Sequence, residues 1–350
     1  DLDGTLLELD VEEFIKEYFK KIGKKIECIS QGQQTVNSIW ESTGYMVKNK
    51  DKNKTNQECF IESFKEKVEN SDEIMKILEN FYKNEFSELK SLSKSNETVK
   101  QSIKLLKQKG YRLVIATNPI FPKDAIIERI KWADLDSSDF EFITSYENMH
   151  YCKPHKEYYQ EILRHIDAKA EETMMVGNNM QEDMVASEVG IKTFLIEDYL
   201  IDSGEPKYIP DYKGNFKDFY RLIEKLPKKL SQRLQTIVDF VEKDAKVVDI
   251  GTDHGYIPVY IVENNISNKV IASDINEAPL NRAKDYVIKK GFENNIETRL
   301  GSGLEPINVN EVDTAVVAGM GGILIARILE SSKEVAKSIQ NFIFQPMGTV

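Results

Sequence analysis

The sequence predicts an α/β protein with two parallel-sheet domains. Two observations lead to this prediction. Short apolar runs alternate with helical stretches in two separate series, and a Pro-Lys-Lys sequence at residues 227–229 lies between the series. Alternating strands and helices favour parallel strands that are joined by crossover helices. We therefore expect one domain over residues 1–226, a linker at 227–229 and a second domain over residues 230–350.

The first domain begins with a long helical region. Apolar residues recur there at helical spacing, for example Phe14 with Tyr18 and Ile74 with Leu78. No strand is expected between residues 12 and 109, and the polar stretch 48–56 is expected to be a loop. The later pattern predicts strands at 112–116, 173–176 and 192–196, a loop at 200–215 and a closing helix at 216–226.

The second domain has a more regular pattern. From residue 230 onward, apolar runs and helical stretches alternate without a long insert. The apolar runs predict five strands, at residues 246–250, 269–273, 296–300, 313–318 and 341–345.

The composition limits the partners of each domain. The chain carries 47 Lys and Arg against 58 Asp and Glu, a net charge of −11, whereas residues 227–350 carry 14 against 16. The acidic first domain is therefore not expected to bind nucleic acid over a broad surface, while the second could carry a local basic patch. No run of 18 apolar residues exists, so no membrane partner is expected. The scattered cysteines Cys28, Cys59 and Cys152 favour a reducing, cytoplasmic location.

A first group of polar residues suits phosphoryl transfer. Asp1 and Asp3 precede a Gly-Thr turn, so that one carboxylate can attack phosphorus while the other handles a proton. Three features follow in order: an apolar run that ends at Thr117, the loop residue Lys153, and the segment 177–183 after another apolar run. Open parallel sheets bind ligands at the carboxyl ends of their strands, where these residues are expected.

This ordered set resembles the haloacid dehalogenase-like phosphohydrolase superfamily over about residues 1–226. The resemblance implies a Rossmann-like core of residues 1–10 and 96–226 that carries a helical cap at about 11–95. It also implies a small phosphorylated metabolite as substrate. Asp1 would form an aspartyl-phosphate, and Asp3 would protonate the leaving oxygen and then deprotonate water. Thr117 would bind a phosphoryl oxygen, and Lys153 would offset its charge.

The same resemblance implies a Mg²⁺ site made of oxygen ligands. The ligands would be Asp1, the backbone carbonyl of Asp3, Asp183 and Asn178. Asn178 departs from the family, which often has Asp at this position. An amide oxygen can still bind the metal directly or through water, so metal binding would weaken without being lost.

Other polar and aromatic residues of this domain have simpler interpretations. His150, His155 and His165 show no metal-binding spacing, and the last two are expected on a solvent-exposed helix. The nearby residues Tyr158, Tyr159 and Ile162 are interpreted as core.

A second group of residues suits a nucleotide-like cofactor. An apolar run leads into a turn in which Asp249 and Asp253 flank Gly251, and a second run ends in Asp274 about 20 residues later. Small turn residues let a cofactor approach the backbone, and the later carboxylate can accept both hydroxyls of a ribose. A Gly-x-Gly-x-x-Gly motif is missing, and the acids of the turn would repel a pyrophosphate. They tolerate an ammonium and a sulfonium, which favours S-adenosylmethionine and a class I methyltransferase.

The full pattern is similar to the bacterial tRNA (adenine(22)-N1)-methyltransferase family from residue 230 to the chain end. The motifs are Leu-Ser-Gln-Arg-Leu at 230–234, Gly-Ser-Gly-Leu at 301–304, Ala-Gly-Met-Gly-Gly at 318–322 and Gln-Pro at 345–346. The resemblance implies tRNA as partner and a set of S-adenosylmethionine contacts. The methionine part of the cofactor would contact Asp249, Gly251, Asp253 and His254. Asp274 would bind the ribose, and Ser302 would lie near the adenine ring. Gly319 and Gly321 would face the target base.

Alternatives remain at several of these residues. Lys228, Lys229 and Arg233 could grip RNA or could be solvated surface charges. His254 could be a structural histidine, and residues 319–322 could be a tight strand-to-helix turn. At the level of the whole chain, only one domain could be catalytic while the other binds or regulates, or the junction could join two neighbouring genes by mistake.

Both ends of the chain suggest a fragment. Asp1 is the expected nucleophile and has no strand before it, and five of the seven strands of a class I methyltransferase sheet are found. The second domain is therefore expected to be an incomplete methyltransferase fold, truncated at its carboxyl end, with an unpaired sheet edge and exposed apolar surface. The α-ammonium of Asp1 is expected to make this chain a poor phosphatase.

Overall fold

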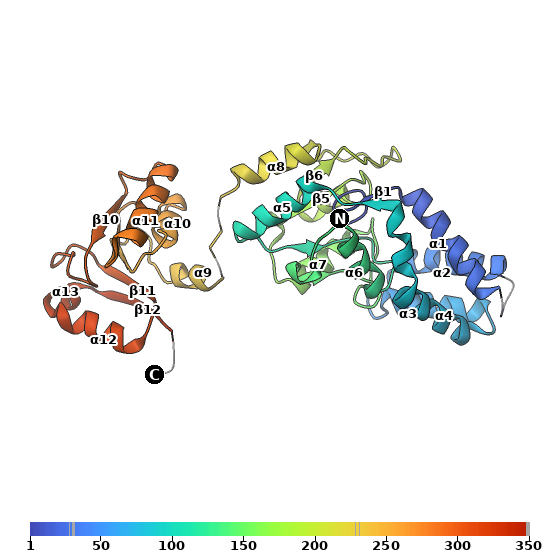
Figure 1. The fold of residues 1–350 in the computed structure, drawn as a ribbon, viewed down its shortest axis with the longest axis horizontal. Coiled ribbons are helices and arrows are strands. Elements are labelled where there is room, and N and C mark those ends of the chain that lie inside the picture. The colour runs from blue at the N-terminus through green and yellow to red at the C-terminus, as the bar shows by residue number, and fades with distance from the viewer. Residues whose placement is uncertain (28, 30–31, 228, 231, 348–350) are drawn as a thin grey trace. The chain divides into compact units, whose positions relative to one another are not determined.

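The computed structural model describes residues 1–27, 29, 32–227, 229–230 and 232–347. The chain divides into two compact units, Asp1–Pro227 and Lys228–Val350 (Figure 1). Three residues of the sequence analysis, Cys28, Lys228 and Ser231, lie outside the described part of the chain. The α/β prediction with parallel sheets is confirmed for both units.

The first unit carries a helical insert between two very short strands. The insert contains α1 (Val11–Ile26), α2 (Gly32–Lys48), α3 (Asn56–Lys67) and α4 (Ser71–Asn84). Strand β1 (Glu8–Leu9) leads into it, and β2 (Ser93–Lys94) leaves it and pairs with β1 in antiparallel fashion. The expectation of no strand between residues 12 and 109 is therefore wrong at β2, because two polar residues carry no apolar pattern.

The ends of these helices follow from their local sequence. The Asp10 side chain accepts a hydrogen bond from the backbone nitrogen of Glu13 and so caps α1. Thr55 and Glu58 form a reciprocal capping box at the start of α3. The predicted loop 48–56 corresponds to the connection between α2 and α3.

An aromatic cluster joins the insert to the rest of the unit. Phe14 of α1 is buried and contacts Phe121 and Trp132, with ring centroids 6.1 and 6.4 Å apart. The 3₁₀ segment Phe86–Leu92 adds Phe86, which stacks on Trp132 at 5.3 Å. Buried aromatic pairs of this kind stabilise a contact beyond their area, so α1 is firmly packed against the core.

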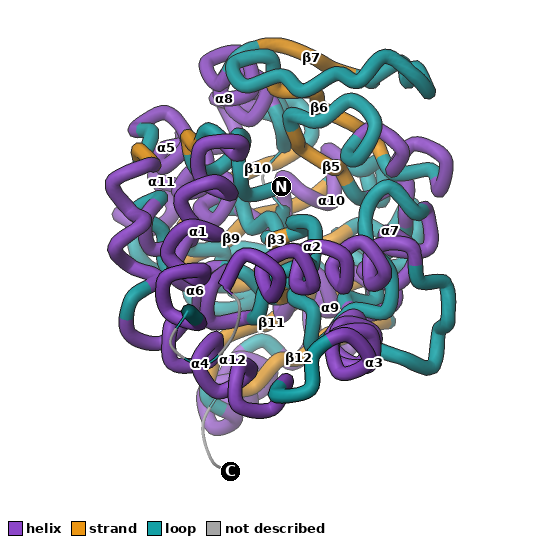
Figure 2. The backbone as a smooth tube through the Cα atoms, turned by 90° about the vertical axis from the view of Figure 1, so that its right-hand side faces the viewer, coloured by secondary structure: helices purple, strands orange, loops and turns teal. Residues whose placement is uncertain are grey.

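The core of the first unit alternates strands and helices. The strands are β3 (Val114–Ile115), β4 (Phe142–Ile143), β5 (Met174–Gly177), β6 (Lys192–Ile196) and β7 (Tyr212–Gly214), and the helices are α5 (Glu97–Gln108), α6 (Lys123–Trp132), α7 (Lys156–His165) and α8 (Phe216–Lys225). Strands β3 and β4 pair in parallel, and β5, β6 and β7 form a parallel sheet in which they lie side by side (Figure 2). Strands at 112–116, 173–176 and 192–196 were expected near β3, β5 and β6. Strand β4 was not expected, and β7 lies in the predicted loop 200–215.

The second unit is one five-stranded parallel sheet with helices on both faces. Its strands are β8 (Val247–Ile250), β9 (Val270–Asp274), β10 (Ile296–Leu300), β11 (Thr314–Met320) and β12 (Asn341–Pro346). Its helices are α9 (Gln232–Asp239), α10 (Tyr256–Glu263), α11 (Glu277–Lys290), α12 (Gly322–Ser331) and α13 (Lys333–Ser338). All five predicted strands are found within two residues of the expected bounds.

The strand order β10-β9-β8-β11-β12 positions the second site. The chain moves outward from β8 to β10 and then returns to the other side of β8 at β11. Ligands of open parallel sheets bind at such a reversal, outside the carboxyl ends of the strands. In the described residues β12 is an edge strand, and Phe344 and Met347 beside that edge are 42% and 55% exposed.

Among the residues that the structure describes, none of the helices combines the length and the apolar character that crossing a membrane requires.

Candidate active sites

The amino-terminal turn of the first unit holds Asp1 beside strand β5. The backbone nitrogen of Asp1 donates a hydrogen bond to the carbonyl of Val176 at 2.8 Å. The chain then turns tightly, since the carbonyl of Leu2 accepts from the backbone nitrogens of Leu6 and Leu7. Gly4 has φ +75°, and a Cβ atom there would lie 2.2 Å from Nδ2 of Asn178. Only glycine therefore fits this close approach.

Lys153 joins two of the expected site carboxylates. Its Nζ lies 2.9 Å from Oδ1 of Asp1 and 2.5 Å from Oδ1 of Asp183. Lys153 and Asp183 are each 1% exposed. Burial is the largest single influence and opposes the charge of this lysine, but Asp183 acting together with Tyr159 and Tyr158 outweighs it, and the pKa of Lys153 is raised. The ammonium is therefore fixed in its charged form between two acids.

The end of β5 shapes the rest of this cluster. A Cβ atom at Gly177 would lie 2.1 Å from Oδ2 of Asp183, and that oxygen accepts from the backbone nitrogen of Asn179 at 2.9 Å. Asn178 accepts from the Thr5 hydroxyl at 3.2 Å and donates to the carbonyl of Tyr199 at 2.6 Å. Thr5 also donates to Oδ2 of Asp1 at 3.3 Å, so Asn178 is linked to Asp1 through Thr5.

Thr117 lies just beyond the end of β3 and is buried. Its backbone carbonyl accepts hydrogen bonds from Tyr158 at 2.7 Å and from Thr144 at 2.8 Å. Tyr158, Tyr159 and Ile162 are buried, as interpreted from the sequence. Tyr158 has a second role that was not foreseen, because its hydroxyl fixes the backbone of Thr117.

Asp3 faces a residue that the sequence analysis missed. Its Oδ2 forms an ion pair with Nη1 of Arg129 on α6 at 2.5 Å. Among the described residues, no hydrogen bond or ion pair links Asp3 to Lys153. Lys153 thus contacts both Asp1 and Asp183 directly. Asn178 is linked to Asp1 through Thr5, and Asp3 contacts Arg129 instead.

The oxygen atoms of this site suit a hard cation. No group of three or more His, Cys, Asp or Glu side chains in the described residues could hold a metal ion. Two carboxylates instead converge on the Lys153 ammonium, and Oδ1 of Asp3 is buried with no hydrogen-bond partner among the described residues. Carboxylate, carbonyl and amide oxygens are the ligands that Mg²⁺ accepts in proteins, so the donor set fits that ion in chemistry.

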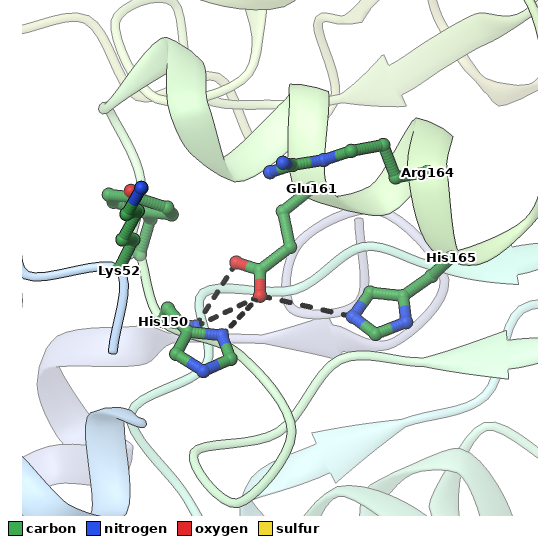
Figure 3. A pocket seen from close by; sticks show the side chains of 6 residues that line it. Lys52, His150, Glu161, Arg164 and His165 are labelled. Atoms are coloured by element: carbon green, nitrogen blue, oxygen red, sulfur yellow. Dashed lines mark hydrogen bonds and ion pairs between the residues drawn. The ribbon is translucent and has the colours of Figure 1, made fainter. Parts of the chain in front are cut away.

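Two of the three histidines of this unit meet at Glu161 (Figure 3). Nδ1 of His150 lies 2.6 Å and Nε2 of His165 lies 3.8 Å from Oε1 of this buried carboxylate. They line a hollow of about 330 Å³ together with Lys52, Tyr151 and Arg164. His155 lies apart at the start of α7, with Nε2 3.2 Å from the carbonyl of Val47.

The second unit forms its candidate site at the end of β8. Gly251 has φ +73°, and a Cβ atom there would lie 2.2 Å from Cε of Met320. Asp253 also has a positive φ, +49°, which is uncommon for a residue with a side chain. Asp249 is buried in β8, and burial, with Asp274 nearby, raises its pKa to about 7.

Asp253, His254 and Asp274 are brought together at the ends of β8 and β9. Oδ2 of Asp274 accepts from the backbone nitrogen of Asp253 at 3.3 Å, and Oδ1 accepts from that of Asn276 at 2.9 Å. Nδ1 of His254 lies 2.7 Å from Oδ2 of Asp253. Arg282, which the sequence analysis missed, donates to the other oxygen of Asp253 at 2.8 Å.

The glycines after β10 and β11 complete the edge of this site. The backbone nitrogen of Gly301 bonds to the carbonyl of Asp274 at 3.0 Å, which brings the adjacent Ser302 to the end of β9. Gly319 has φ +75° and donates to Oε1 of Gln345 at 3.2 Å, while Gly321 caps α12. A Cβ atom at Gly319 or Gly321 would meet nothing closer than 3.8 Å, so room remains for a ligand.

The carboxylates and open glycines of this edge fit the chemistry of S-adenosylmethionine. Each oxygen of Asp274 accepts one backbone donor, and a carboxylate has further lone pairs for hydroxyl groups. Of the residues expected to contact RNA, Arg233 donates to Oε1 of Gln345 at 2.5 Å.

Comparison with known proteins also divides the chain in two, because one match ends at residue 196 and another begins at residue 230. Residues 230–350 match the family described as "Methyltransferase domain". The tRNA (adenine(22)-N(1))-methyltransferase of Bacillus subtilis is 43% identical over 118 residues, which are 34% of this chain and 50% of that protein. The solved structure of M. capricolum TrmK in complex with S-adenosyl-homocysteine is 38% identical over a match that covers 29% of this chain and 46% of that chain, with a TM-score of 0.28.

The first unit has relatives of a different kind. Pyrophosphatase PpaX of Bacillus mycoides is 30% identical over 120 residues, which are 33% of this chain and 54% of that protein. The chain thus spans about half the length of the curated relatives it matches. Both sets of relatives are enzymes. Because residues 1–196, more than half of the sequence, match the family model of the haloacid dehalogenase-like hydrolases, the chain belongs to that family.

Proposed function

We propose that the protein carries two activities, phosphoester or phosphoanhydride hydrolysis in its first unit and methylation of adenine N1 in tRNA in its second. The observation that carries the first activity is the Lys153 ammonium held between Asp1 and Asp183 at the end of β5. The observation that carries the second is the group of Asp253, His254 and Asp274 at the reversal of strand order. The boundary between the activities is proposed at residues 227–229, with residues 11–95 as a cap.

In the hydrolase reaction Asp1 is the proposed nucleophile. Its carboxylate attacks phosphorus to give an aspartyl-phosphate, and Lys153 offsets negative charge on the transferring group. Thr117 donates a hydrogen bond to a phosphoryl oxygen. Asp3 protonates the leaving oxygen and then accepts a proton from the water that attacks the aspartyl-phosphate.

Mg²⁺ is proposed to bind at this site through Asp1, the carbonyl of Asp3, Asp183 and Asn178. When bound, the ion would offset charge on the phosphoryl group. The support is the oxygen-only donor set and the close placement of Asp1 and Asp183 on either side of Lys153.

The substrate is a small phosphorylated metabolite. Since the curated relatives of this unit are named pyrophosphatases, inorganic pyrophosphate is the first compound to test. Phosphate release should require Asp1, because Asp1→Asn removes the nucleophile, while Asp72→Asn on an exposed helix face should have no effect. Release that survives in Asp1→Asn would contradict the hydrolase assignment.

In the methyltransferase reaction the residues of the second unit bind and align. Asp249, Gly251, Asp253 and His254 are proposed to contact the methionine part of S-adenosylmethionine, which supplies the methyl group. Asp274 is proposed to hold the ribose and Ser302 to lie by the adenine ring. Gly319 and Gly321 are proposed to lie by the target base.

No side chain is required as a base in this reaction. Adenine N1 has a free lone pair once its base pair opens, so the site must orient the reactants and exclude water. Opening the pair costs a few kcal/mol and favours a loosely paired position in the tRNA.

Binding and transfer can be tested separately. Isothermal titration with S-adenosylmethionine should show binding that Asp274→Asn weakens and that Asp285→Asn, an exposed acid on α11, leaves unchanged. Transfer of the tritiated methyl group to unmodified tRNA should likewise be lower in Asp274→Asn and unchanged in Asp285→Asn. Equal binding by both variants would remove Asp274 from the proposed site.

A further inference from the structure

Arg129 is a buried cation in contact with the proposed proton-transfer residue of the hydrolase. It is 1% exposed, and its Nη1 pairs with Oδ2 of Asp3, which is 126 positions away in the sequence. Its Nε and Nη2 atoms are buried and have no hydrogen-bond partner within the part of the chain that the structure describes. Within the described residues, the Asp3 carboxylate is therefore the hydrogen-bond partner of a guanidinium group that can donate five hydrogen bonds.

This arrangement is poorly suited to stabilising the fold. A buried guanidinium with unpaired donors loses hydration that one ion pair does not recover. Apolar side chains of similar volume often replace such pairs without loss of stability. Stability alone therefore does not explain why Arg129 is buried, and a functional role would explain it.

The packing of Arg129 links Asp3 to the helical insert. The guanidinium carbon lies 4.7 Å from the ring centre of Phe121 and 5.8 Å from that of Phe14. Phe14 belongs to α1, the first helix of the insert, and is 1% exposed. Two aromatic faces thus hold the guanidinium while its Nη1 holds the carboxylate, so α1 and Asp3 meet at one side chain.

We propose that Arg129 is a positioning residue that fixes the carboxylate of Asp3 for proton transfer, and that Phe14 of α1 fixes Arg129 in turn. The inference rests on the proposed hydrolase function. When the bond between phosphorus and the leaving oxygen breaks and the bond to Asp1 forms, the proton passes from Asp3 to the leaving oxygen. When water attacks the phosphorus of the aspartyl-phosphate, the bond from phosphorus to Asp1 breaks, Asp3 takes a proton from that water, and inorganic phosphate leaves. Arg129 neither gives nor takes a proton and acts only through Asp3.

A double-mutant cycle with Asp3 tests this role. Phosphate release from pyrophosphate and from glycerol 2-phosphate is measured for Arg129→Met, Asp3→Asn and the pair, in the complete chain. General acid–base groups contribute about 10² to 10⁴-fold, so we expect Arg129→Met to lower kcat by about 10 to 100-fold with a small change in KM. In the Asp3→Asn background the same change should lower kcat by less than about threefold, because the group that Arg129 positions is already disabled.

Two further variants distinguish positioning from support of the fold. Arg129→Lys keeps a cation beside Asp3 and should restore part of kcat, whereas Arg112→Met, which removes an exposed arginine paired with Glu141, should leave it unchanged. Phe14→Leu should lower kcat less than Arg129→Met does, and only when Asp3 is present. Thermal unfolding identifies any variant that fails to fold, and the pair Asp3→Asn with Arg129→Met leaves no unpaired charge between these two residues.

The outcomes separate this inference from the function on which it rests. If Arg129→Met lowers kcat equally with and without Asp3, or does not lower it, Arg129 is not a positioning residue even though Asp1→Asn is inactive and Asp3→Asn keeps only a small residual kcat. If Asp1→Asn and Asp3→Asn both keep full activity, the hydrolase mechanism fails and the role of Arg129 fails with it.

Discussion

The two candidate sites hold their carboxylates by different means. In the first unit, Asp1 and Asp183 are fixed by one buried ammonium, that of Lys153, which is 1% exposed. In the second unit, Asp274 is fixed by backbone nitrogen atoms, and the partners of Asp253 are exposed side chains. The difference follows the proposed chemistry. Phosphoryl transfer needs fixed charge against a developing anion, whereas methyl transfer needs shape and alignment.

The largest expected effect comes from removing the shared cation of the first site. Lys153→Met leaves two carboxylates without their ammonium, and breaking a buried pair in this way costs about 3–5 kcal/mol of unfolding free energy. Loss of a single charge-stabilising group also lowers turnover by about 10² to 10³-fold. Phosphate release and the urea dependence of tryptophan fluorescence, from Trp40 and Trp132 of the first unit, would measure both effects.

The comparison also predicts what Lys153→Met leaves intact. Binding of S-adenosylmethionine to the second unit should be unchanged, since no residue of that site uses Lys153. Lys169→Met, at an exposed position, should alter neither phosphate release nor the free energy of unfolding. A loss of S-adenosylmethionine binding in Lys153→Met would show that the two units are coupled.

The second effect is a pH dependence that belongs to the second unit. The pKa of Asp249 is about 7 in the folded chain because the carboxyl is buried, compared with 3.8 for an ordinary Asp. Between pH 4 and 7 the folded state therefore binds a proton that the unfolded state has lost, so stability falls as the pH rises through this window. The full shift corresponds to roughly 4 kcal/mol, and stability should be level above pH 7 as far as Asp249 is concerned.

Asp249→Asn should remove this dependence, because an amide does not ionise. Hydrogen exchange of peptides from β8 and β9, corrected for the intrinsic effect of pH, would measure the stability of the sheet in both proteins. Equal pH dependence in the two proteins would mean that Asp249 is ionised throughout.

A third prediction compares two glycines with nearly the same backbone. Gly4 and Gly251 have φ of +75° and +73°, and a Cβ atom at either would lie 2.2 Å from a neighbouring side-chain atom. A side chain in this region costs about 1–2 kcal/mol at both positions. The neighbour of Gly251 is the flexible end of Met320, which can turn away, whereas that of Gly4 is the amide of Asn178, which is bonded to Tyr199.

Gly4→Ala should therefore destabilise its unit more than Gly251→Ala destabilises the other, by about 1–3 kcal/mol for the displaced hydrogen bond. Urea unfolding of the first unit and hydrogen exchange of the second would compare them. If the two losses are equal, the Asn178 amide is as free to move as the Met320 side chain.

The same contrast explains what the sequence could predict. The five strands of the second unit carry apolar runs at even spacing, so their order along the chain was found with bounds in error by at most two residues. Strands β2, β4 and β7 have two or three residues and no such pattern, and hydrogen bonding to a distant partner defines them. In the first unit, Lys153, which was expected in a loop before a helix, contacts both Asp1 and Asp183.

Arg129 and Arg282 could not be foreseen in the same way. Arg129 lies on the buried face of α6 beside Ile126 and Ile130, whereas Arg282 is exposed on α11, and the carboxylates that they pair with are 126 and 29 residues away. The sequence shows which residues follow a strand but does not show which helix face turns toward them. Helical spacing places Arg129 on the apolar face of α6, but its partner Asp3 and the rings of Phe14 and Phe121 that pack on it become visible only in the folded chain.

The smallest expected effect concerns Arg282, the exposed counterpart of these buried cations. Arg282 and Asp253 are each more than half exposed, so their ion pair should contribute less than about 1 kcal/mol to stability. His254 still holds Asp253 when Arg282→Ala removes the arginine, and we expect the affinity for S-adenosylmethionine to change by less than about threefold, a difference under 1 kcal/mol. Titration of Arg282→Ala, with Lys284→Ala two residues further along α11 as the control, would measure this. A tenfold loss confined to Arg282→Ala would mean that the second site also depends on a fixed cation, and the distinction between the two sites would then lie in burial alone.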